Sequence, residues 1–398
     1  YAPALWAHQG RIRIFRVAPK SRSVPPTVWV DVTRTARQAR NTGVERVTRE
    51  VSRALLRLAE TEDIGVKFFS VGHFGHLSPV PNRWLDAPNS VNLPTKRGRA
   101  IIRREDSVLL LDLSLPPRGL NASDVRYLKR QRVQVIQVVY DLLPLTVPHL
   151  FPAQKKLIFS FWLKQVLNAQ SLLFISSKVR LEFVQLFGNS RADVMAILPL
   201  SPTPVLVKKH PAALKARGHG SLRLVAVGTL EPRKDYESLV NAFRIARKKG
   251  VPLELVIVGS PGWSKHTVTE ILRLSEQEAS WLTLKQGLSD AEVHTLIESS
   301  LGLIANSIDE GFGLPLVEAG AQGTRVLARD IPIFREVAPW ASFFSGNSAE
   351  EVADSIIEAV QLGGGFMPEQ LREGSSWISA ASTVFEVVKG FARRNETS

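Results

Sequence analysis

Two stretches of the chain alternate short apolar strands with amphipathic helices, and this alternation constrains the fold most. A segment such as TVWVDVT (27–33) is rich in apolar and β-branched residues, which is typical of a strand buried on both faces. Strands of that kind, separated by helices, indicate a parallel sheet that helices cover on both sides. In the first stretch we expect strands over 27–33, 66–71, 107–113, 133–142 and 171–177, with helices from Val44 to about Leu58 and over Gln154–Leu167.

The pattern is interrupted around residues 202–221, where three prolines, two lysines and a Gly/His/Ser run are typical of a linker. The alternation then resumes with LRLVAVG (222–228), and a helix is expected to begin at Pro315. The further strands expected are 253–259, 282–287, 301–307 and 325–330, and the further helices are Tyr236 to about Lys249, about 265–280, 290–299 and from Ala349 onward.

The sequence therefore predicts an α/β protein of two Rossmann-like, doubly wound domains that face each other across a cleft. A chain of 398 residues is long enough for two domains, and 44% hydrophobic residues suffice for two cores. The expected segments are an extension or linker (1–26), an N-terminal domain (27–205), a linker (206–221), a C-terminal domain (222–375) and a C-terminal helix that crosses back to the first domain (376–398).

The composition excludes several classes of protein. The absence of cysteine excludes disulfides and thiolate metal sites, which fits a cytosolic enzyme. No apolar run approaches the roughly 20 residues of a membrane-spanning helix, and the first residues lack the apolar core of a secretory signal. The start at Tyr1 rather than Met is expected of a fragment or a trimmed chain.

Charge is unevenly divided along the chain. Residues 1–210 hold 32 lysines and arginines against 14 acids, a net of +18, whereas residues 211–398 have a net of −4. A basic first half predicts an anionic partner: a membrane surface, a phosphorylated lipid or nucleic acid. The alternative is a set of solvated basic faces. No nucleic-acid-binding motif accompanies the charge, so no nucleic-acid partner is expected.

The first candidate functional segment is EGFGLPLVEAGAQG (310–323), where Glu310 and Glu318 bracket a glycine-rich turn. Pro315 suits the first turn of a helix, and glycines let a ligand approach the free N–H groups of that turn. The segment predicts one carboxylate on a loop and a second, Glu318, in the first helical turn. The alternative is an ordinary junction with solvated acids.

A second candidate is VGTLEPRKD (227–235), in which a strand is followed by Arg233 and Lys234 before a helix. Two cations at such a position can bind a diphosphate, the arginine by a bidentate fork and the lysine as a point charge. The alternative is a pair of surface cations. No Asp-x-Asp motif and no histidine spacing typical of a metal site is present, so no metal and no cofactor are expected.

These segments resemble blocks of the retaining glycosyltransferases of family 4 (glycosyl transferases group 1), which have the GT-B fold. The resemblance covers roughly residues 27–390 and is strongest over 222–340. VGTLEPRKDYESLVNAF resembles the donor-diphosphate segment, and EGFGLPLVEAGAQGT the E-x7-E element. VIVGSPGW, ARDIPIFREVA and SSWISAASTVF resemble further blocks in the same order, and NTGVERV (41–47) resembles the glycine loop of the first domain.

The resemblance implies a role for each matching residue. Arg233 and Lys234 would hold the donor diphosphate, Glu310 would face the donor sugar, and Glu318 would bind the ribose hydroxyls. Gly43 would lie near the β-phosphate and sugar. The other implied donor-binding residues are Gly228, Thr229, Gly311, Phe312, Gly313 and Leu314, and the implied acceptor-side residues are Tyr140 and Asp141.

Two positions depart from the family pattern. Thr229 stands where many members have arginine, and Tyr140 stands where many have histidine before Asp141. Arg233 is expected to compensate for the first departure. The second leaves open a non-catalytic nucleotide-sugar-binding or scaffold protein of the same fold.

The function expected is that of a metal-independent, retaining hexosyltransferase in cell-surface polysaccharide synthesis. The donor would be a nucleotide diphosphate sugar, with GDP-mannose suggested by blocks that resemble bacterial O-antigen mannosyltransferases. The acceptor would be a glycan, free or linked to polyprenyl diphosphate. We expect a cytoplasmic protein, peripheral on an anionic inner-membrane face.

Overall fold

The computed structural model describes residues 16–20, 25–37, 43–72, 75–85, 100–114, 119–189, 192–202, 222–369, 371 and 376–396. The chain divides into two compact units: unit 1 comprises Tyr1–Leu200 and Ser376–Ser398, and unit 2 comprises Ser201–Ser375. The linker expected over 206–221 and most of the extension 1–26 lie outside the described residues.

Unit 1 is built on a sheet with the strand order β3-β2-β1-β4-β5-β6-β7 in the described part of the chain. All neighbouring strands are parallel except β2 and β3. Its elements are β1 (Thr27–Asp31), η1 (Thr35–Arg37), α2 (Gly43–Ala59), β2 (Gly65–Val71), β3 (Leu77–Val80), η2 (Asn82–Leu85), β4 (Ser107–Leu110), α3 (Ala122–Arg130), β5 (Gln134–Val139), α4 (Leu143–Thr146), η3 (Pro148–Leu150), α5 (Ala153–Val166), β6 (Ser171–Phe174), α6 (Ser177–Phe187), β7 (Val194–Ile197) and α14 (Trp377–Glu396).

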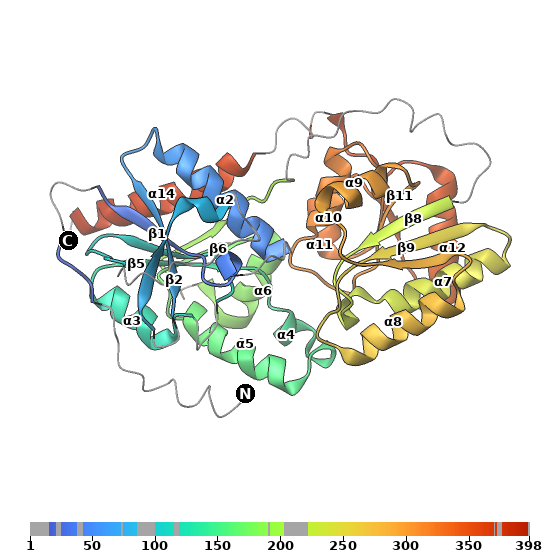
Figure 1. Cartoon of the computed structure of the whole chain (residues 1–398), viewed down its shortest axis with the longest axis horizontal. Helices are drawn as coiled ribbons and strands as arrows, with labels where there is room; N and C mark the ends of the chain where they lie inside the picture. The colour runs from blue at the N-terminus through green and yellow to red at the C-terminus, as the bar shows by residue number, and fades with distance from the viewer. Residues whose placement is uncertain are drawn as a thin grey trace. The chain divides into compact units, whose positions relative to one another are not determined.

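Helices cover both faces of this sheet (Figure 1). On one face α3, α5 and α6 bury a core that includes Leu128, Trp162 and Phe183. On the other face α14 packs against α2, although the two helices are separated by most of the chain. Continuous apolar strands need helices on both faces of the sheet, because both faces of a strand like VWV would otherwise meet water.

Unit 2 holds a second sheet of parallel strands, in the order β10-β9-β8-β11-β12-β13. Its elements are β8 (Leu222–Val227), η5 (Pro232–Lys234), α7 (Tyr236–Lys248), β9 (Leu253–Val258), α8 (Lys265–Gln277), β10 (Leu282–Lys285), α9 (Asp290–Glu298), β11 (Gly302–Ala305), α10 (Leu314–Ala321), β12 (Val326–Arg329), α11 (Pro332–Val337), β13 (Ser342–Phe344) and α12 (Ala349–Leu362).

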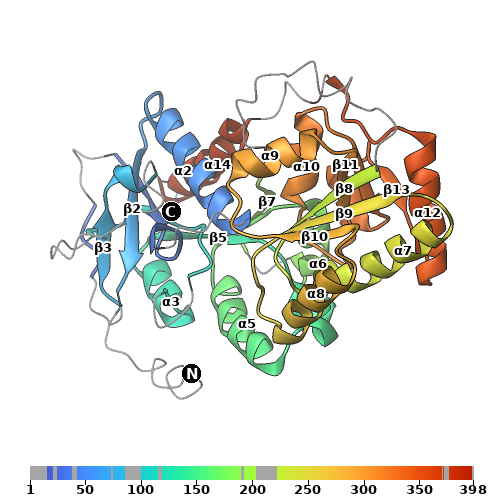
Figure 2. The same cartoon turned by 45° about the vertical axis from the view of Figure 1, so that its right-hand side comes forward.

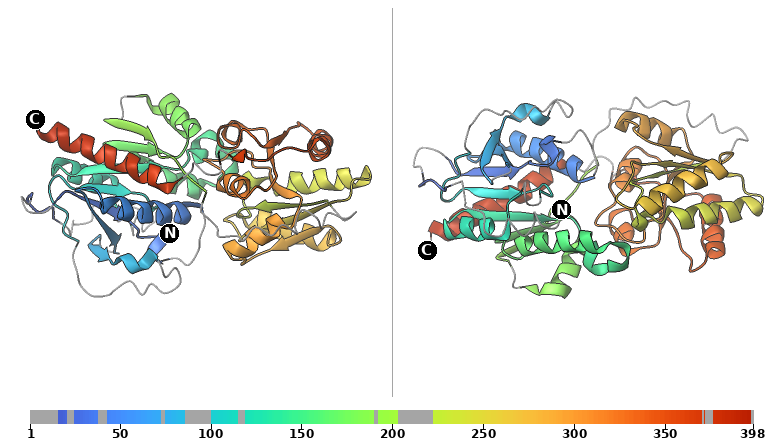
Figure 3. Two further views of the ribbon diagram at one scale, coloured as in Figure 1. Left: turned by 90° about the horizontal axis from the view of Figure 1, so that it is seen from above. Right: turned by 60° about the horizontal axis from the view of Figure 1, so that its bottom comes forward.

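Two cores fill the two faces of the second sheet. One includes Phe243 of α7, Ile271 of α8 and Ile356 of α12. The other includes Leu316 of α10 and Phe334 of α11. Figure 2 shows α9 and α10 on one side of the strands and α7 and α8 on the other, and the views in Figure 3 show the same layering in each unit. The prediction of two doubly wound α/β sheets is confirmed.

The sequence interpretation erred in detail where strands are short or exposed. It missed β3, β7 and β13, which are edge strands of the two sheets, and β3 runs antiparallel to its neighbour, so the first sheet is mixed rather than wholly parallel. β3 is an edge strand containing Pro79, and proline weakens a strand pattern. Most predicted strands are also longer than the observed ones: the segment 133–142 contains only Gln134–Val139 as strand.

Candidate functional site

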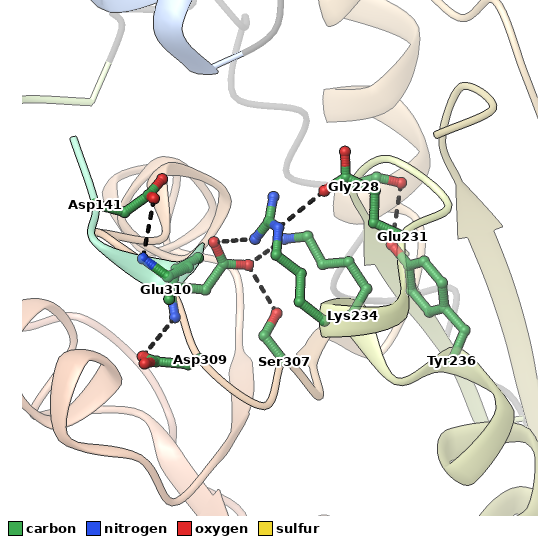
Figure 4. A network of polar contacts seen from close by, with 10 residues as sticks. Asp141, Gly228, Glu231, Lys234, Tyr236, Ser307, Asp309 and Glu310 are labelled. Atoms are coloured by element: carbon green, nitrogen blue, oxygen red, sulfur yellow. Dashed lines mark hydrogen bonds and ion pairs between the residues drawn. The ribbon is translucent and has the colours of Figure 1, made fainter. Parts of the chain in front are cut away.

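The candidate site in unit 2 lies at the carboxyl ends of β8 and β11. These strands are parallel neighbours, with Gly302 opposite Leu224, so their following loops leave from the same edge of the sheet. Ligands of doubly wound sheets bind outside this edge. The loop after β8 contains η5 with Arg233 and Lys234, and the loop after β11 brings Glu310 to both cations (Figure 4).

Glu310 is the centre of the polar network. Its Oε1 accepts a hydrogen bond from Lys234 Nζ at 2.5 Å and one from Ser307 Oγ at 2.8 Å. Its Oε2 forms an ion pair with Arg233 Nη1. The Glu310 backbone N–H donates to Asp309 Oδ1 at 2.7 Å. Three side chains therefore fix this carboxylate. Glu310 is only 8% exposed, so the carboxylate is also shielded from water.

The charges in this cluster oppose the cost of burial. Burial alone would raise the pKa of Glu310, but Arg233, Lys234 and the hydrogen bonds from Lys234 and Ser307 lower that pKa to about 2. Burial lowers the pKa of Lys234, and the adjacent Glu310 carboxylate counteracts part of that effect. The glutamate is therefore ionised at neutral pH, and its charge favours the protonated lysine.

A glycine makes the close approach of Lys234 possible. A Cβ atom at Gly228 would lie 2.7 Å from Lys234 Cε, closer than such atoms come in real structures. The Gly228 carbonyl accepts a hydrogen bond from the Tyr236 hydroxyl at 3.1 Å. Glu231 Oε2 accepts from Arg233 Nε at 2.9 Å, which orients the guanidinium. The neighbouring Thr229 is half-buried in the same loop.

The glycine-rich turn ends at the start of α10. Gly313 is the N-cap and has a φ of +107°, a left-handed conformation that favours glycine. Leu314 is the first helical residue and is buried, Gly311 is buried, and Phe312 is half-buried. A cavity of about 20 Å³ is lined by residues of this turn, of β8 and of β11, including Gly313, Lys234 and Glu310.

The start predicted for α10 was wrong by one residue, which moves Glu318 out of the first helical turn. Glu318 is the fifth residue of α10 and therefore belongs to the second turn. The helix begins one residue before Pro315, not at it, and proline is accepted at the second position as well as the first because both N–H groups lack a partner within the helix. The Glu318 side chain is buried, 7% exposed.

Several residues that support the site were missed. Asn306 follows β11 and donates from Nδ2 to the Asp235 carbonyl at 2.8 Å and to Ser238 Oγ at 3.0 Å. Arg329 Nη1 donates to Asp235 Oδ2 at 2.8 Å. These contacts fix the junction between η5 and α7, where Asp235 has a φ of +51°. The available signal was the polar pair Asn306–Ser307 directly after an apolar strand.

Three predicted site residues belong to unit 1. Gly43 is the exposed first residue of α2. Tyr140 follows β5 and is buried, and its hydroxyl donates to the Leu111 carbonyl at 2.7 Å. Burial raises the pKa of Tyr140, so the phenol stays neutral. Asp141 Oδ1 accepts a hydrogen bond from the Leu143 N–H at 3.3 Å. The Tyr140 hydroxyl is thus already bonded to the backbone of its own unit.

No group of three or more histidine, cysteine or acidic side chains in the described residues is arranged to hold a metal ion.

Comparison with known proteins places this site in a family. Residues 215–375 match the model of the family described as glycosyl transferases group 1. The serotype-specific mannosyltransferase WbdA of Escherichia coli is 27% identical over 355 residues, which cover 84% of this chain and 41% of that protein. The O-antigen chain mannosyltransferase B of Escherichia coli is 23% identical over 349 residues, covering 80% of this chain and 87% of that protein. The chain thus spans about two fifths of the length of WbdA.

Solved structures show the same fold. A glycosyltransferase from Rickettsia africae aligns with a TM-score of 0.60 at 14% identity, covering 92% of this chain and 99% of that one. The sucrose-phosphate synthase of Thermosynechococcus elongatus aligns with a TM-score of 0.59 at 14% identity, covering 93% and 100%. The chain has the GT-B fold, and the match to the group 1 glycosyl transferase model lies within unit 2. The resemblance that the sequence motifs indicated is confirmed.

Proposed function

We propose that the protein is a retaining glycosyltransferase that moves a hexose from a nucleotide diphosphate sugar to a glycan acceptor without a metal ion. The observation that supports it most is the cluster at the carboxyl edge of the second sheet, where half-buried Arg233 and Lys234 pair with buried Glu310. Transfer breaks the bond between the anomeric carbon and the diphosphate and forms a bond from that carbon to an acceptor hydroxyl. The acceptor proton passes to the leaving phosphate.

In this reaction the two cations would neutralise the leaving diphosphate, as a divalent ion does in metal-dependent enzymes. Negative charge develops on the leaving diphosphate, and prepositioned cations in a buried site stabilise such charge strongly. In the structure both cations pair with Glu310, and Arg233 also pairs with Glu231. The diphosphate would therefore take over part of this pairing, and Glu310 would be released toward the sugar. Glu318 would bind the ribose hydroxyls.

The donor we propose is GDP-mannose, because two proteins to which the chain is similar, WbdA and the O-antigen chain mannosyltransferase B, are mannosyltransferases. The acceptor we propose is a glycan of a cell-surface polysaccharide, free or carried on polyprenyl diphosphate. The second candidate is a protein that binds a nucleotide sugar without transferring it. The inward-directed hydroxyl of Tyr140, at a position where many relatives have histidine, favours this alternative.

Turnover of the donor separates the two candidates. We expect a thermal-shift screen of nucleotide sugars to raise the apparent Tm with a guanosine-based donor, because a ligand that binds only the folded state stabilises it. The enzyme should then release nucleoside diphosphate from that donor, slowly by hydrolysis and faster with acceptor. A clear thermal shift with no diphosphate release under either condition would favour the binding protein.

We further propose that the protein is cytoplasmic and binds the anionic inner face of the membrane through unit 1. Within the part of the chain that the structure describes, no helix combines the length and hydropathy needed to cross a bilayer. α5 presents Lys155 and Lys156 beside Leu157, which is 43% exposed. Exposed cations attract anionic headgroups, each contributing roughly 1 kcal/mol, and exposed leucine adds apolar contact.

Binding to vesicles should therefore require anionic lipid and should weaken steeply with added salt, since the attraction decays within a Debye length. The double charge reversal Lys155→Glu/Lys156→Glu should reduce binding clearly. The matched control reverses two exposed lysines at the end of α7 in unit 2, Lys248 and Lys249, and should have little effect. Equal partitioning of the wild-type protein onto neutral and anionic vesicles would contradict the proposal.

A further inference from the structure

A pair of buried carboxyl groups lies where the strand order of the first sheet reverses. Asp31 is the last residue of β1, and Asp112 follows the end of β4, the strand paired with β1 on the side away from β2. Asp31 is 1% exposed and Asp112 is 3% exposed. The proposed reaction assigns no role to either group. Such a reversal, at the carboxyl ends of the strands, is where ligands enter doubly wound sheets.

Asp112 holds the turn that connects β1 to α2. Its Oδ2 accepts hydrogen bonds from two successive backbone N–H groups, those of Arg34 and Thr35, each at 2.6 Å. Its Oδ1 is buried and has no hydrogen-bond partner among the residues that the structure describes. Asp31 Oδ1 accepts a bond from the Thr33 N–H at 2.9 Å and another from the Thr33 hydroxyl at 2.5 Å. Both carboxyl groups therefore bind the first residues of the same turn.

The same turn is tied to the first turn of α2. Arg34 Nη2 forms an ion pair with Glu45 Oε1 at 3.0 Å, and Glu45 is fully buried two residues after Gly43. Asp112 thus fixes the backbone of Arg34, and Arg34 in turn contacts the start of α2. The charged and titratable groups that face the carboxyl pair are Arg34 and Arg37 of the turn, Glu45 of α2, and Tyr140 after β5. Arg49 of α2 also donates to the turn, at Thr35 O.

We infer that Asp112 is a positioning residue for donor binding, because it holds the backbone of Arg34 and Thr35 and, through the ion pair of Arg34 with Glu45, the start of α2. This inference rests on the proposed function and on the role near the donor phosphate and sugar that the sequence resemblance implies for Gly43. Asp112 is buried and acts only through the backbone of Arg34 and Thr35. Its loss should weaken donor binding more than it slows the chemical step.

Protonation of the pair adds a second expectation. Burial raises the pKa of Asp31 to about 7, with a further contribution from the charge of Asp112. Burial raises the pKa of Asp112 to about 6, against the opposing effects of the two N–H groups and Arg34. Above pH 7 both groups are ionised, and two buried like charges repel each other. The turn should therefore loosen, and the donor KM rise, as the pH increases from about 6 to 8.

The stability of the folded protein should also fall as the pH rises. Both pKa values are higher in the folded protein than the ordinary value of 3.8. Between about pH 4 and 7 the folded state consequently holds protons that the unfolded state has released, so stability falls as the pH rises through this window. An asparagine at position 112 cannot ionise, and its Oδ1 can still accept both N–H bonds. Asp112→Asn should flatten the dependence of both KM and stability on pH.

The test compares Asp112→Ala, Asp112→Asn and the wild-type protein. For Asp112→Ala we expect a donor KM about tenfold higher at pH 6, with kcat changed less than twofold, because the N–H groups of the turn lose their acceptor. For Asp112→Asn we expect a KM near the wild-type value at pH 6 and below it at pH 8. Hydrogen exchange of the Arg34 and Thr35 amides should accelerate in the alanine variant and stay slow in the asparagine variant.

Asp106 provides a matched control at the other end of the same strand. It precedes β4, is 3% exposed, and accepts hydrogen bonds from the Thr27 N–H at 3.0 Å and the Arg103 N–H at 2.7 Å. Burial raises its pKa as well. Because Asp106 lies at the amino edge of the sheet, Asp106→Asn should leave the donor KM and its pH profile unchanged even if it lowers the Tm.

Each outcome decides the inference. A wild-type KM in Asp112→Ala, or an equal KM increase in Asp112→Asn and Asp106→Asn, would overturn it. If Asp112→Ala fails to fold, an Asp112→Asn profile that rises with pH as steeply as that of the wild-type protein would overturn it also. If the wild-type protein binds no nucleotide sugar, the proposed function fails and the donor role fails with it. The exchange of the two amides would then still show separately whether Asp112 holds the turn.

Discussion

Lys234→Ala should lower kcat/KM for the donor by about 100-fold or more, the scale of removing one prepositioned charge from a transition state. The Lys234 side chain is only 14% exposed beside Glu310 and Arg233, so its charge acts in a site that is largely shielded from water. The substitution also removes one of the two cations that pair with Glu310. Steady-state kinetics with a verified donor measure the loss.

The control for this substitution is Lys248→Ala, which removes an exposed lysine from the end of α7 in the same unit. Its kcat/KM should stay within a factor of about two, because exposed charges contribute little. Unchanged kinetics of Lys234→Ala would show that Lys234 does not hold the leaving diphosphate.

The two glutamates of the E-x7-E element should respond differently to substitution. Glu310→Ala should mainly lower kcat, because Glu310 contacts both cations and is proposed to face the reacting sugar. Glu318→Ala should mainly raise the donor KM, because a ribose contact is remote from the changing bonds and stabilises ground state and transition state equally. Glu276→Ala, at an exposed position on α8, serves as the control. Full activity in both variants would refute the assignment of this element.

The electrostatics of Glu310 lead to a shift of the pH profile. Burial lowers the pKa of Lys234, and the Glu310 carboxylate is the main influence that raises it. Glu310→Gln removes that charge but keeps an oxygen that can accept from Ser307. Lys234 should then lose its proton at a lower pH than in the wild-type protein. The alkaline limb of the kcat/KM profile should move to lower pH in Glu310→Gln, and an unmoved limb would show that the two groups are not coupled in this way.

Much of the fold was predictable because its signals are local. Apolar, β-branched runs such as 253–259 identify a strand buried on both faces without reference to the rest of the chain. Capping contributes as well: Ser289 and Glu292 form a capping box at the start of α9, where a helix was predicted at residue 290. Short edge strands carry no such signal, which is why β3, β7 and β13 were missed.

The residues of the candidate site were predictable, but their pairing was not. Glycine-rich turns after strands pointed to Gly228, Gly313 and the charged residues beside them. That Glu310 neutralises Arg233 and Lys234, 77 and 76 positions earlier, depends on β8 and β11 being neighbours in the sheet. Strand order is a long-range property that no local pattern encodes. The same reason explains why Asp31 and Asp112 escaped notice, since only the pairing of β1 with β4 joins them.

The position of α14 in the chain has a consequence for biosynthesis. This helix completes unit 1, where Gln134 Nε2 donates to the Val387 carbonyl at 3.3 Å and Lys389 pairs with Glu62 at 2.7 Å. Yet it is translated only after the whole of unit 2. Until α14 is made, the apolar side of α2 in the nascent chain therefore stays uncovered. Unit 2, whose residues are contiguous, can already fold by then. Nascent chains stalled before residue 377 should bind a holdase chaperone, and chains that include α14 should release it.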